Sequence, residues 1–288
     1  MTIELAQPRV DQLSEATSAL RSWQHEGAPM QLHPGDIGWY WRFGTETTAA
    51  AVRTWSRDGR ILAVGLLDGS DLLRITMAPD SRRDEELSHQ LTQDLTDPKR
   101  GVLPEGKVYV EAPQDALIQE LLHETGWATD EPWTPLRLDL TEPVKDPGIR
   151  YEVAGPDKAH VAAEVVRASF DKSTFTEDRW QAMASGVPFA DARCLVAYDE
   201  NDNAVATVTV WSAGPGKPGL IEPMGVHRDH RGHGHGKAMN IAAAAVLREL
   251  GSSSVLVCTP SSNVGAVATY KSAGFQARPE VLDRRRDG

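Results

Sequence analysis

Cysteine is scarce in this chain of 288 residues, which contains only Cys194 and Cys258. Two cysteines are too few for a disulfide framework, so the class of small disulfide-stabilised proteins is excluded. No segment approaches the roughly 18 consecutive apolar residues that a membrane-spanning helix needs. The first residues, MTIELAQPRVDQLSEA, contain no basic stretch followed by an apolar one, so we expect no signal peptide. These absences predict a cytoplasmic protein with no membrane partner.

Positive charge is also in short supply. The chain has 30 Lys and Arg residues against 41 Asp and Glu residues, which gives a formal net charge of −11. An acidic surface repels phosphate groups, so this balance argues against a nucleic-acid partner. It favours a cationic substrate such as an amine, although the need for solubility explains the charge as well.

The predicted secondary structure repeats along the chain, which is long enough for two domains of about 150 residues each. In each half, helical patterns precede a strand hairpin, and a helix, a strand and a short helix follow it. The turns TGW at 125–127 and AGF at 273–275 are offset by 148 residues, and the starts of MAPDSRR and VHRDHRG are offset by 149. The stretch TEPVKDPGIR at 141–150 predicts a linker, because it carries two prolines and a glycine. We therefore expect tandem domains at 1–145 and 146–288.

Two segments receive no regular element in this scheme. The segment GWYWRFG at 38–44 is an aromatic stretch. Its Trp39, Tyr40 and Trp41 are expected in a core or domain interface, with stacking on a ligand as the alternative. The tail ARPEVLDRRRDG at 277–288 is short for a final strand.

The most distinctive segment, HRDHRGHGHGKAMN at 227–240, follows a predicted strand over Leu220–Val226 and leads into an alanine-rich helix. A strand, a glycine loop and a helix N-terminus in this order bring free backbone N–H groups and the positive end of the helix dipole together. Glycine lets the backbone approach a ligand and adopt positive φ angles. Arg231 and Lys237 would add charge opposite a pyrophosphate. The segment therefore predicts a phosphate-binding loop.

Other interpretations of this loop fit less well. The glycines at 232, 234 and 236 do not match the dinucleotide-binding spacing GxGxxG, and the GK[ST] of a P-loop is missing. Four nearby histidines would suit zinc, but no carboxylate or thiolate stands at a zinc spacing, and three glycines make a poor rigid cage. We therefore predict no metal site, and a solvated loop without a role is the remaining alternative.

The residues Arg231, Gly234 and Gly236 resemble the acetyl-CoA loop of the GNAT superfamily of N-acetyltransferases. The chain also carries the spaced residues of that superfamily's next helix and terminal turn, namely Asn263, Ala266, Tyr270, Gly274 and Phe275. The resemblance covers about residues 149–275. It implies an α/β fold with two tandem domains, each a mixed, mostly antiparallel sheet flanked by helices, in which the fourth and fifth strands splay apart. Mycothiol synthase-like tandem enzymes resemble this arrangement.

Acetyl-CoA is the donor substrate that the resemblance implies. Its pantetheine arm would lie between the splayed strands and bind backbone groups of Met224 and Val226. The pyrophosphate would bind the backbone amides of the loop, with contributions from Arg231, Gly232, His233, Gly234, His235, Gly236 and Lys237. The following helix would complete the donor site through Asn263, Ala266 and Tyr270.

The first half resembles the same fold without this donor loop. The three loop glycines correspond there to Arg83, Glu85 and Leu87, and Tyr270 corresponds to Leu122. Glu85 and Glu86 would repel a pyrophosphate, and no glycine opens the backbone. We therefore expect that the first half does not bind acetyl-CoA.

Acetyl transfer to an amine needs a base for the amine, a stabilised thioester oxygen and an acid for the leaving thiolate. Tyr270 is the candidate acid, with a packed structural tyrosine as the alternative. The backbone amide of Met224 is the candidate oxyanion donor. Glu222 is the candidate base, and a carboxylate that only binds the substrate is the alternative. Strand alternation places Glu222, Met224 and Val226 on one face, unless Pro223 adds a bulge.

The acceptor pocket of this fold is commonly walled by the region after the first helix. The resemblance suggests substrate-binding roles here for Phe170, Asp171, Phe175, Trp180, Trp211 and Glu222, and core packing is the alternative for each aromatic residue. Cys258 is expected to be a buried structural thiol rather than a nucleophile.

Together, these features predict an acetyl-CoA-dependent N-acetyltransferase that acts on a primary amine of a small molecule, as a monomer or homodimer. An aminoglycoside or aminosugar antibiotic is the leading acceptor, which would make the reaction a detoxification and a route to antibiotic resistance. Mycothiol-type biosynthesis, an amino acid or polyamine, and a protein N-terminus or lysine stay open as alternatives. A non-catalytic acyl-CoA sensor is the alternative from another class.

Overall fold

The computed structural model describes residues 2–288 and divides them into two compact units. The first unit contains the described residues up to His33, Glu46–Trp133 and Glu280–Gly288, and the second contains Pro34–Thr45 and Thr134–Pro279. The units are therefore interleaved in sequence, whereas the expected division at 145/146 follows chain order. A segment of the first half belongs to the second unit, and the C-terminal residues belong to the first.

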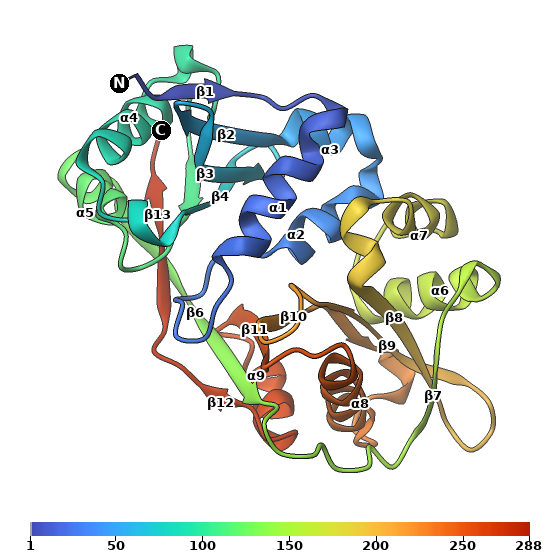
Figure 1. Cartoon of the computed structure of the whole chain (residues 1–288). Helices are drawn as coiled ribbons and strands as arrows, with labels where there is room; N and C mark the ends of the chain where they lie inside the picture. Colours follow the sequence, from blue (N-terminus) through green and yellow to red (C-terminus); the bar gives the residue numbers. More distant parts are fainter. Residues whose placement is uncertain (1) are drawn as a thin grey trace. The chain divides into compact units, whose positions relative to one another are not determined.

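The first unit contains a sheet of short strands (Figure 1). Its strand order is β1 (Glu4–Ala6), β2 (Val52–Arg57), β3 (Arg60–Leu67), β4 (Leu72–Met77), β5 (Val108–Glu111), β13 (Val281–Arg286) and the start of β6 (Ala128–Asp139). β4 and β5 pair in parallel, and the other neighbours pair antiparallel. Asp58 and Gly59 have positive φ angles at the β2–β3 turn, which agrees with the predicted hairpin.

The helical elements of this unit are η1 (Val10–Gln12), α1 (Leu13–Trp23), α3 (Thr45–Ala51), η3 (Pro79–Ser81), α4 (Glu85–Thr96), η4 (Pro98–Arg100) and α5 (Leu117–Glu124). α4 and α5 pack against each other. Their apolar faces join the sheet in a core of buried residues that includes Trp55, Ile75, Leu87, Leu91 and Ile118. This burial of one face of each element stabilises the unit.

The second unit contains a second sheet with strand order β6, β11 (Ser254–Pro260), β10 (Pro218–Val226), β9 (Ala204–Trp211), β8 (Ala192–Tyr198) and β7 (Arg150–Val153), and β12 (Gln276–Ala277) also pairs with β6. β10 and β11 run parallel but pair only from Pro218–Leu220 to Ser254–Leu256. Beyond Leu220 no pairing joins them, although β10 continues to Val226. The expected mixed sheet with a splayed parallel pair is thus confirmed.

The helical elements of the second unit are α2 (Pro34–Tyr40), η2 (Trp41–Phe43), η5 (Pro156–Lys158), α6 (Ala159–Ser169), α7 (Glu177–Ala184), η6 (Val187–Asp191), η7 (Arg228–His230), α8 (His235–Glu249) and α9 (Val264–Ser272). α6 and α8 both pack on β9 and β10, and they cover opposite faces of the sheet (Figure 1). The core includes Leu136, Ile221, Met239, Val255 and Tyr270. Residues 227–234, which include η7, connect the end of β10 to the start of α8.

One expectation from the sequence needs correction, and one segment without a predicted element is helical. The aromatic stretch at 38–44 contains the end of α2 and η2. The tail is long enough for a final strand, because β13 pairs with β5 through Arg284 opposite Val110, and with β6 through Arg284 opposite Thr129. β13 is rich in arginine, so its strand conformation depends on two partners that lie far away in sequence.

Among the described residues, no helix combines the length and the apolar character that crossing a membrane requires.

Candidate active site

β10 is interrupted where the candidate base lies. Ile221 pairs with Val210 and Met224 pairs with Val208, so Glu222 and Pro223 together face one residue of β9. This is the geometry of a β-bulge, and it means that simple alternation does not extend across Pro223. The indole Nε1 of Trp211 donates a hydrogen bond of 2.6 Å to the carbonyl oxygen of Glu222. The Glu222 side chain is half-buried at this break.

Tyr270 lies on α9 with only 6% of its surface exposed, and its ring centroid is 5.6 Å from that of Phe275. Burial raises the pKa of the Tyr270 hydroxyl far above its usual value, and the electrostatic effects of Glu222 and Cys258 raise that pKa further. The hydroxyl therefore stays protonated at neutral pH and can donate a proton. Glu222 and Cys258 are thus the two residues whose electrostatic effect reaches the Tyr270 hydroxyl.

Cys258 differs from the buried thiol expected from the sequence, because it is only partly buried on β11. Cys194, by contrast, is fully buried, and burial raises the pKa of its thiol. A buried neutral thiol is unreactive, so Cys194 has a structural role.

The loop before α8 has the backbone geometry of an anion cradle. Gly232 and Gly234 have φ angles of 85° and 83°, in the left-handed region that other residues rarely adopt. Gly236 is needed for a different reason, because a Cβ atom there would lie 2.8 Å from the Cγ2 atom of Thr269. The glycines thus turn the chain and seat the start of α8 on α9. A helix N-terminus with exposed preceding residues is suited to bind phosphate.

The side chains of this loop divide into bound and exposed groups. Arg231 donates a hydrogen bond of 2.7 Å to the carbonyl oxygen of Ser169, at the end of α6. Lys237 is exposed. The side-chain Oδ1 atom of Asn263 caps α9 by accepting a hydrogen bond of 3.1 Å from the backbone amide of Ala266. These contacts show that Arg231 and Asn263 shape the loop and the helix, whereas Lys237 is open to a ligand.

The loop histidines form two pairs. The rings of His227 and His230 are 5.2 Å apart, and those of His233 and His235 are 6.0 Å apart. Burial lowers the pKa of His235, its neighbours His233 and His230 lower it further, and Asp199 opposes them. Within residues 2–288, no three His, Cys, Asp or Glu side chains are grouped to hold a metal ion.

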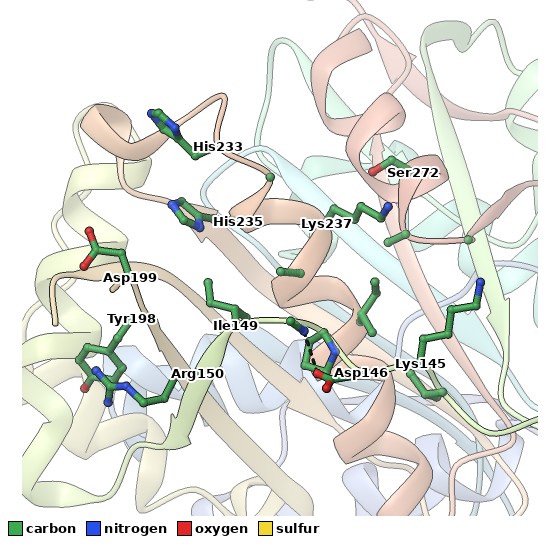
Figure 2. Close-up of a pocket in the computed structure, with 18 of the residues that line it drawn as sticks. Lys145, Asp146, Ile149, Arg150, Tyr198, Asp199, His233, His235, Lys237 and Ser272 are labelled. Carbon is green, nitrogen blue, oxygen red and sulfur yellow. Dashed lines mark hydrogen bonds between the residues drawn. The ribbon is translucent and has the colours of Figure 1, made fainter. Parts of the chain in front are cut away.

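A groove of about 1160 Å³ opens beside the start of α8 (Figure 2). Its walls come from the segment between Leu138 and Arg150, the β8–β9 turn, α8 and the end of α9. Gly234, His235 and Lys237 belong both to this wall and to the cradle, whereas Glu222 and Tyr270 do not line the groove. Six carboxylates and three Lys or Arg residues line it, so its charge does not favour an anion away from the cradle.

The predicted acceptor-side residues are not equivalent. Trp180 is fully buried with its ring 5.6 Å from that of Phe189, so it belongs to the core. Phe175 is also buried, and its ring lies 5.1 Å from that of Trp39. Phe170 is 40% exposed and remains a candidate contact surface.

Two further predicted residues lie elsewhere in this region. Asp171 is exposed, 3.6 Å from Arg228. Trp211 is buried, and it acts on Glu222 through the hydrogen bond described above.

Helix α2 has no counterpart among the elements predicted from the sequence. This helix contacts β10, β9, η6 and α7 within the second unit. A Cβ atom on Gly38 would lie 2.3 Å from the Cζ3 atom of Trp211, so the indole ring packs directly on the backbone of α2. Pro34 at the first helical position is a signal that could have predicted the helix. No pattern in the sequence indicates its partner.

A splayed parallel strand pair, a glycine loop and a following helix define the architecture of the GNAT acetyltransferases. Residues 162–275 match the family model described as "Acetyltransferase (GNAT) family", so this part of the chain is similar to that family. The general activity that this family implies is acyl transfer. Comparison with curated protein sequences gives no match.

Solved structures share the fold over the whole chain. A GCN5-related N-acetyltransferase from Sphaerobacter thermophilus is 19% identical with a TM-score of 0.60, covering 99% of this chain and 95% of that one. A tandem GNAT protein from the clavulanic acid biosynthesis pathway is 16% identical with a TM-score of 0.62, covering 99% and 98%. A GNAT-family acetyltransferase from Colwellia psychrerythraea is 14% identical with a TM-score of 0.63, covering 100% of both chains. The chain is therefore similar in fold to GNAT proteins over nearly their whole solved chains, and one of them is a tandem protein.

Proposed function

We propose that this chain is an acetyl-CoA-dependent N-acetyltransferase whose second unit acetylates a primary amine of a small molecule. The observation that carries the proposal is the loop before α8, where Gly232 and Gly234 open the backbone next to the part of β10 that does not pair with β11. The raised pKa of the buried Tyr270 hydroxyl, to which the charge of Glu222 contributes, supports an acid and a base at this site. Glu222 lies on β10, and Tyr270 lies on α9, the helix that follows β11. An acid and a base are the groups that acyl transfer to an amine requires.

The donor would bind along this gap. The residues fit its phosphates, because Gly232 and Gly234 open the backbone before the N-terminus of α8, a helix of 15 residues. The backbone amides from Gly232 to Lys237 would hold the pyrophosphate, and Lys237 would add a positive charge. Backbone groups of Met224 and Val226 would hold the pantetheine arm, since no strand pairing occupies β10 on the β11 side there.

Each residue has a defined part in the reaction. Glu222 accepts a proton from the attacking amine, directly or through water, while the nitrogen bonds to the thioester carbonyl carbon. The Met224 amide donates to the carbonyl oxygen as negative charge builds up on it. Tyr270 donates its proton to the sulfur as the carbon–sulfur bond breaks. The products are the acetylated amine and the free thiol of CoA.

The corresponding helix of the first unit supports a single donor site per chain. At the start of α4, the Asp84 carboxylate accepts a 2.8 Å hydrogen bond from the Leu87 amide and pairs with Arg57 at 2.8 Å. Glu86 also pairs with Arg57, at 3.0 Å. The chain's own carboxylates thus occupy the place where a donor phosphate would bind.

An aminoglycoside or aminosugar is the acceptor that we favour, because the net charge of −11 attracts polycationic amines. Mycothiol-type biosynthesis, amino acids, polyamines and protein amines are the competing acceptors. A non-catalytic acyl-CoA sensor is the competing function. The proposed reaction takes place in the cytoplasm.

Calorimetry and an acceptor screen test this proposal together. Titration with acetyl-CoA should give one site per chain, and a stoichiometry near two would contradict the role of α4. Aminoglycosides, amino acids, polyamines and peptides are then incubated with acetyl-CoA, and mass spectrometry looks for an acetylated product. Donor binding without any acetylated product from the whole panel would favour the sensor.

A further inference from the structure

Trp211 links the candidate base to a helix from the other half of the chain. This residue has 1% of its surface exposed and lies at the end of β9, beside the bulge of β10. Its Nε1 donates a hydrogen bond of 2.6 Å to the carbonyl oxygen of Glu222, which is one of the two bulged residues. A bulge removes regular strand pairing, so side-chain hydrogen bonds gain weight in fixing its backbone.

Packing also restricts the indole ring of Trp211. The indole packs against the backbone of Gly38 on α2. No side chain fits at Gly38, because a Cβ atom there would lie 2.3 to 2.8 Å from three carbons of the Trp211 ring. Phe189 contacts the ring in a T-shaped arrangement, with centroids 6.0 Å apart. Trp211 therefore has little freedom to rotate while α2 is in place.

We propose that Trp211 is a positioning residue for Glu222, and that the Gly38 backbone of α2 sets the position of Trp211. This inference rests on the proposed function, because it assumes that Glu222 is the base. It also gives the first half of the sequence a role in catalysis. Although that half has no donor loop, its residues 34–45 belong to the second unit and support the base.

The first experiment replaces Trp211 by Phe, which keeps an aromatic ring but removes the N–H donor. Turnover at neutral pH should fall roughly 10-fold and recover at high pH, where solvent deprotonates the amine and a misplaced base matters less. Acetyl-CoA affinity should stay within twofold. A purely structural role would lower turnover by the same factor at every pH, and that result would overturn the proposal.

A double-mutant cycle makes this test independent of folding losses. If Trp211 acts through Glu222, W211F should cause little further loss in the E222Q background. If the two losses multiply, Trp211 acts by another route and the inference is wrong. Trp41→Phe is the matched control. Trp41 is also buried, but its Nε1 donates a hydrogen bond of 3.1 Å to the hydroxyl of Thr45 instead of to β10. It should leave the pH profile unchanged.

The second experiment tests α2 through Gly38→Ala, which displaces the indole. The variant should reproduce the pH-dependent loss of W211F, and it should add nothing to that loss when combined with it. Gly186→Ala is matched to it, because a Cβ atom there would lie 2.7 Å from the Cγ atom of Trp41. An equal pH-dependent loss in both variants would show general destabilisation and would overturn the role of α2.

These outcomes separate the inference from the proposed function. If the wild-type chain binds acetyl-CoA but acetylates no amine, the proposed function fails before Trp211 is tested. If the wild-type chain is active and W211F retains its turnover and pH profile, only the inference fails.

Discussion

Gly236 and Thr269 lie so close together that a Cβ atom on the glycine would stand 2.8 Å from the threonine Cγ2 atom. Gly236→Ala should therefore push the start of α8 away from α9 and disturb the cradle amides. We expect the acetyl-CoA dissociation constant to rise about 10-fold, equivalent to about 1.4 kcal/mol, by calorimetry. Adding Thr269→Ser, which removes the methyl group but keeps the hydroxyl that donates to Gly265, should restore affinity.

Gly265→Ala is the control for this pair. The nearest atom to a Cβ there is the Asn263 Oδ1 atom at 3.9 Å, so the added methyl group meets no obstacle. Equal losses in Gly236→Ala and Gly265→Ala would show that close packing is not the reason for the glycine at 236.

Gly234→Glu should abolish acetyl-CoA binding while the fold is kept. The residue has a φ angle of 83° at the N-cap of α8, and a carboxylate there would repel the pyrophosphate. Gly101→Glu introduces the same kind of side chain at a φ angle of 74° in the first unit, so it controls for backbone strain. Calorimetry on both variants is the measurement, and unchanged affinity in Gly234→Glu would refute the phosphate loop.

Tyr270→Phe should lower turnover by roughly 100-fold, since it removes the proton donor but keeps the ring. Acetyl-CoA affinity should change little, because the packing against Phe275 persists. Tyr151→Phe makes the same chemical change at a half-buried tyrosine of the second unit and should be neutral. If Tyr270→Phe keeps wild-type turnover with the true acceptor, the thiolate takes its proton from water.

Glu222→Gln should reduce turnover most at neutral pH, with activity returning as the pH rises and more amine is deprotonated in solution. A carboxylate that only binds the ammonium group would behave differently. Its loss would raise the KM for the acceptor and leave turnover nearly intact. Steady-state kinetics from about pH 6 to about pH 10 decides between the two roles, because side-chain bases and amines titrate in this range.

Asp283 on β13 provides a prediction about stability in the first unit. Burial raises its pKa from 3.8 to about 7, repulsion by Glu111 and Asp130 adds to this, and Arg74 opposes it. The folded state therefore holds a proton that the unfolded state releases above pH 3.8, so stability falls as pH rises from about 4 to 7 and stays low above it.

Asp283→Asn should remove this pH-dependent loss of folding free energy. We expect the variant to be more stable than the wild type at pH 8 by about 2 kcal/mol and nearly equal to it at pH 4, measured by denaturant unfolding. Asp287→Asn on the adjoining exposed segment is the control and should change stability little, because surface ion pairs contribute little. A pH-independent difference for Asp283→Asn would contradict the assignment.

Local patterns in the sequence were sufficient for the loop and the helices around it. The order of strand, glycines and helix at 220–250 predicts free amides at a helix N-terminus, because these features are set by neighbouring residues. The spacing from Asn263 to Phe275 predicts α9 and its terminal turn for the same reason. The mixed sheet with a splayed parallel pair followed from the resemblance that these motifs carry.

Tertiary structure decided what depends on partners distant in the chain. β13 forms between β5 and β6, about 170 and 150 residues earlier, and its own sequence has little strand preference. The packing of Gly38 on Trp211 and the bond from Trp211 to Glu222 join residues from both halves of the chain. No local period encodes such contacts, since they depend on complementary shape and on which backbone groups a bulge leaves unpaired. The sequence therefore determined the chemistry of the loop, and only the folded chain determined what supports the base.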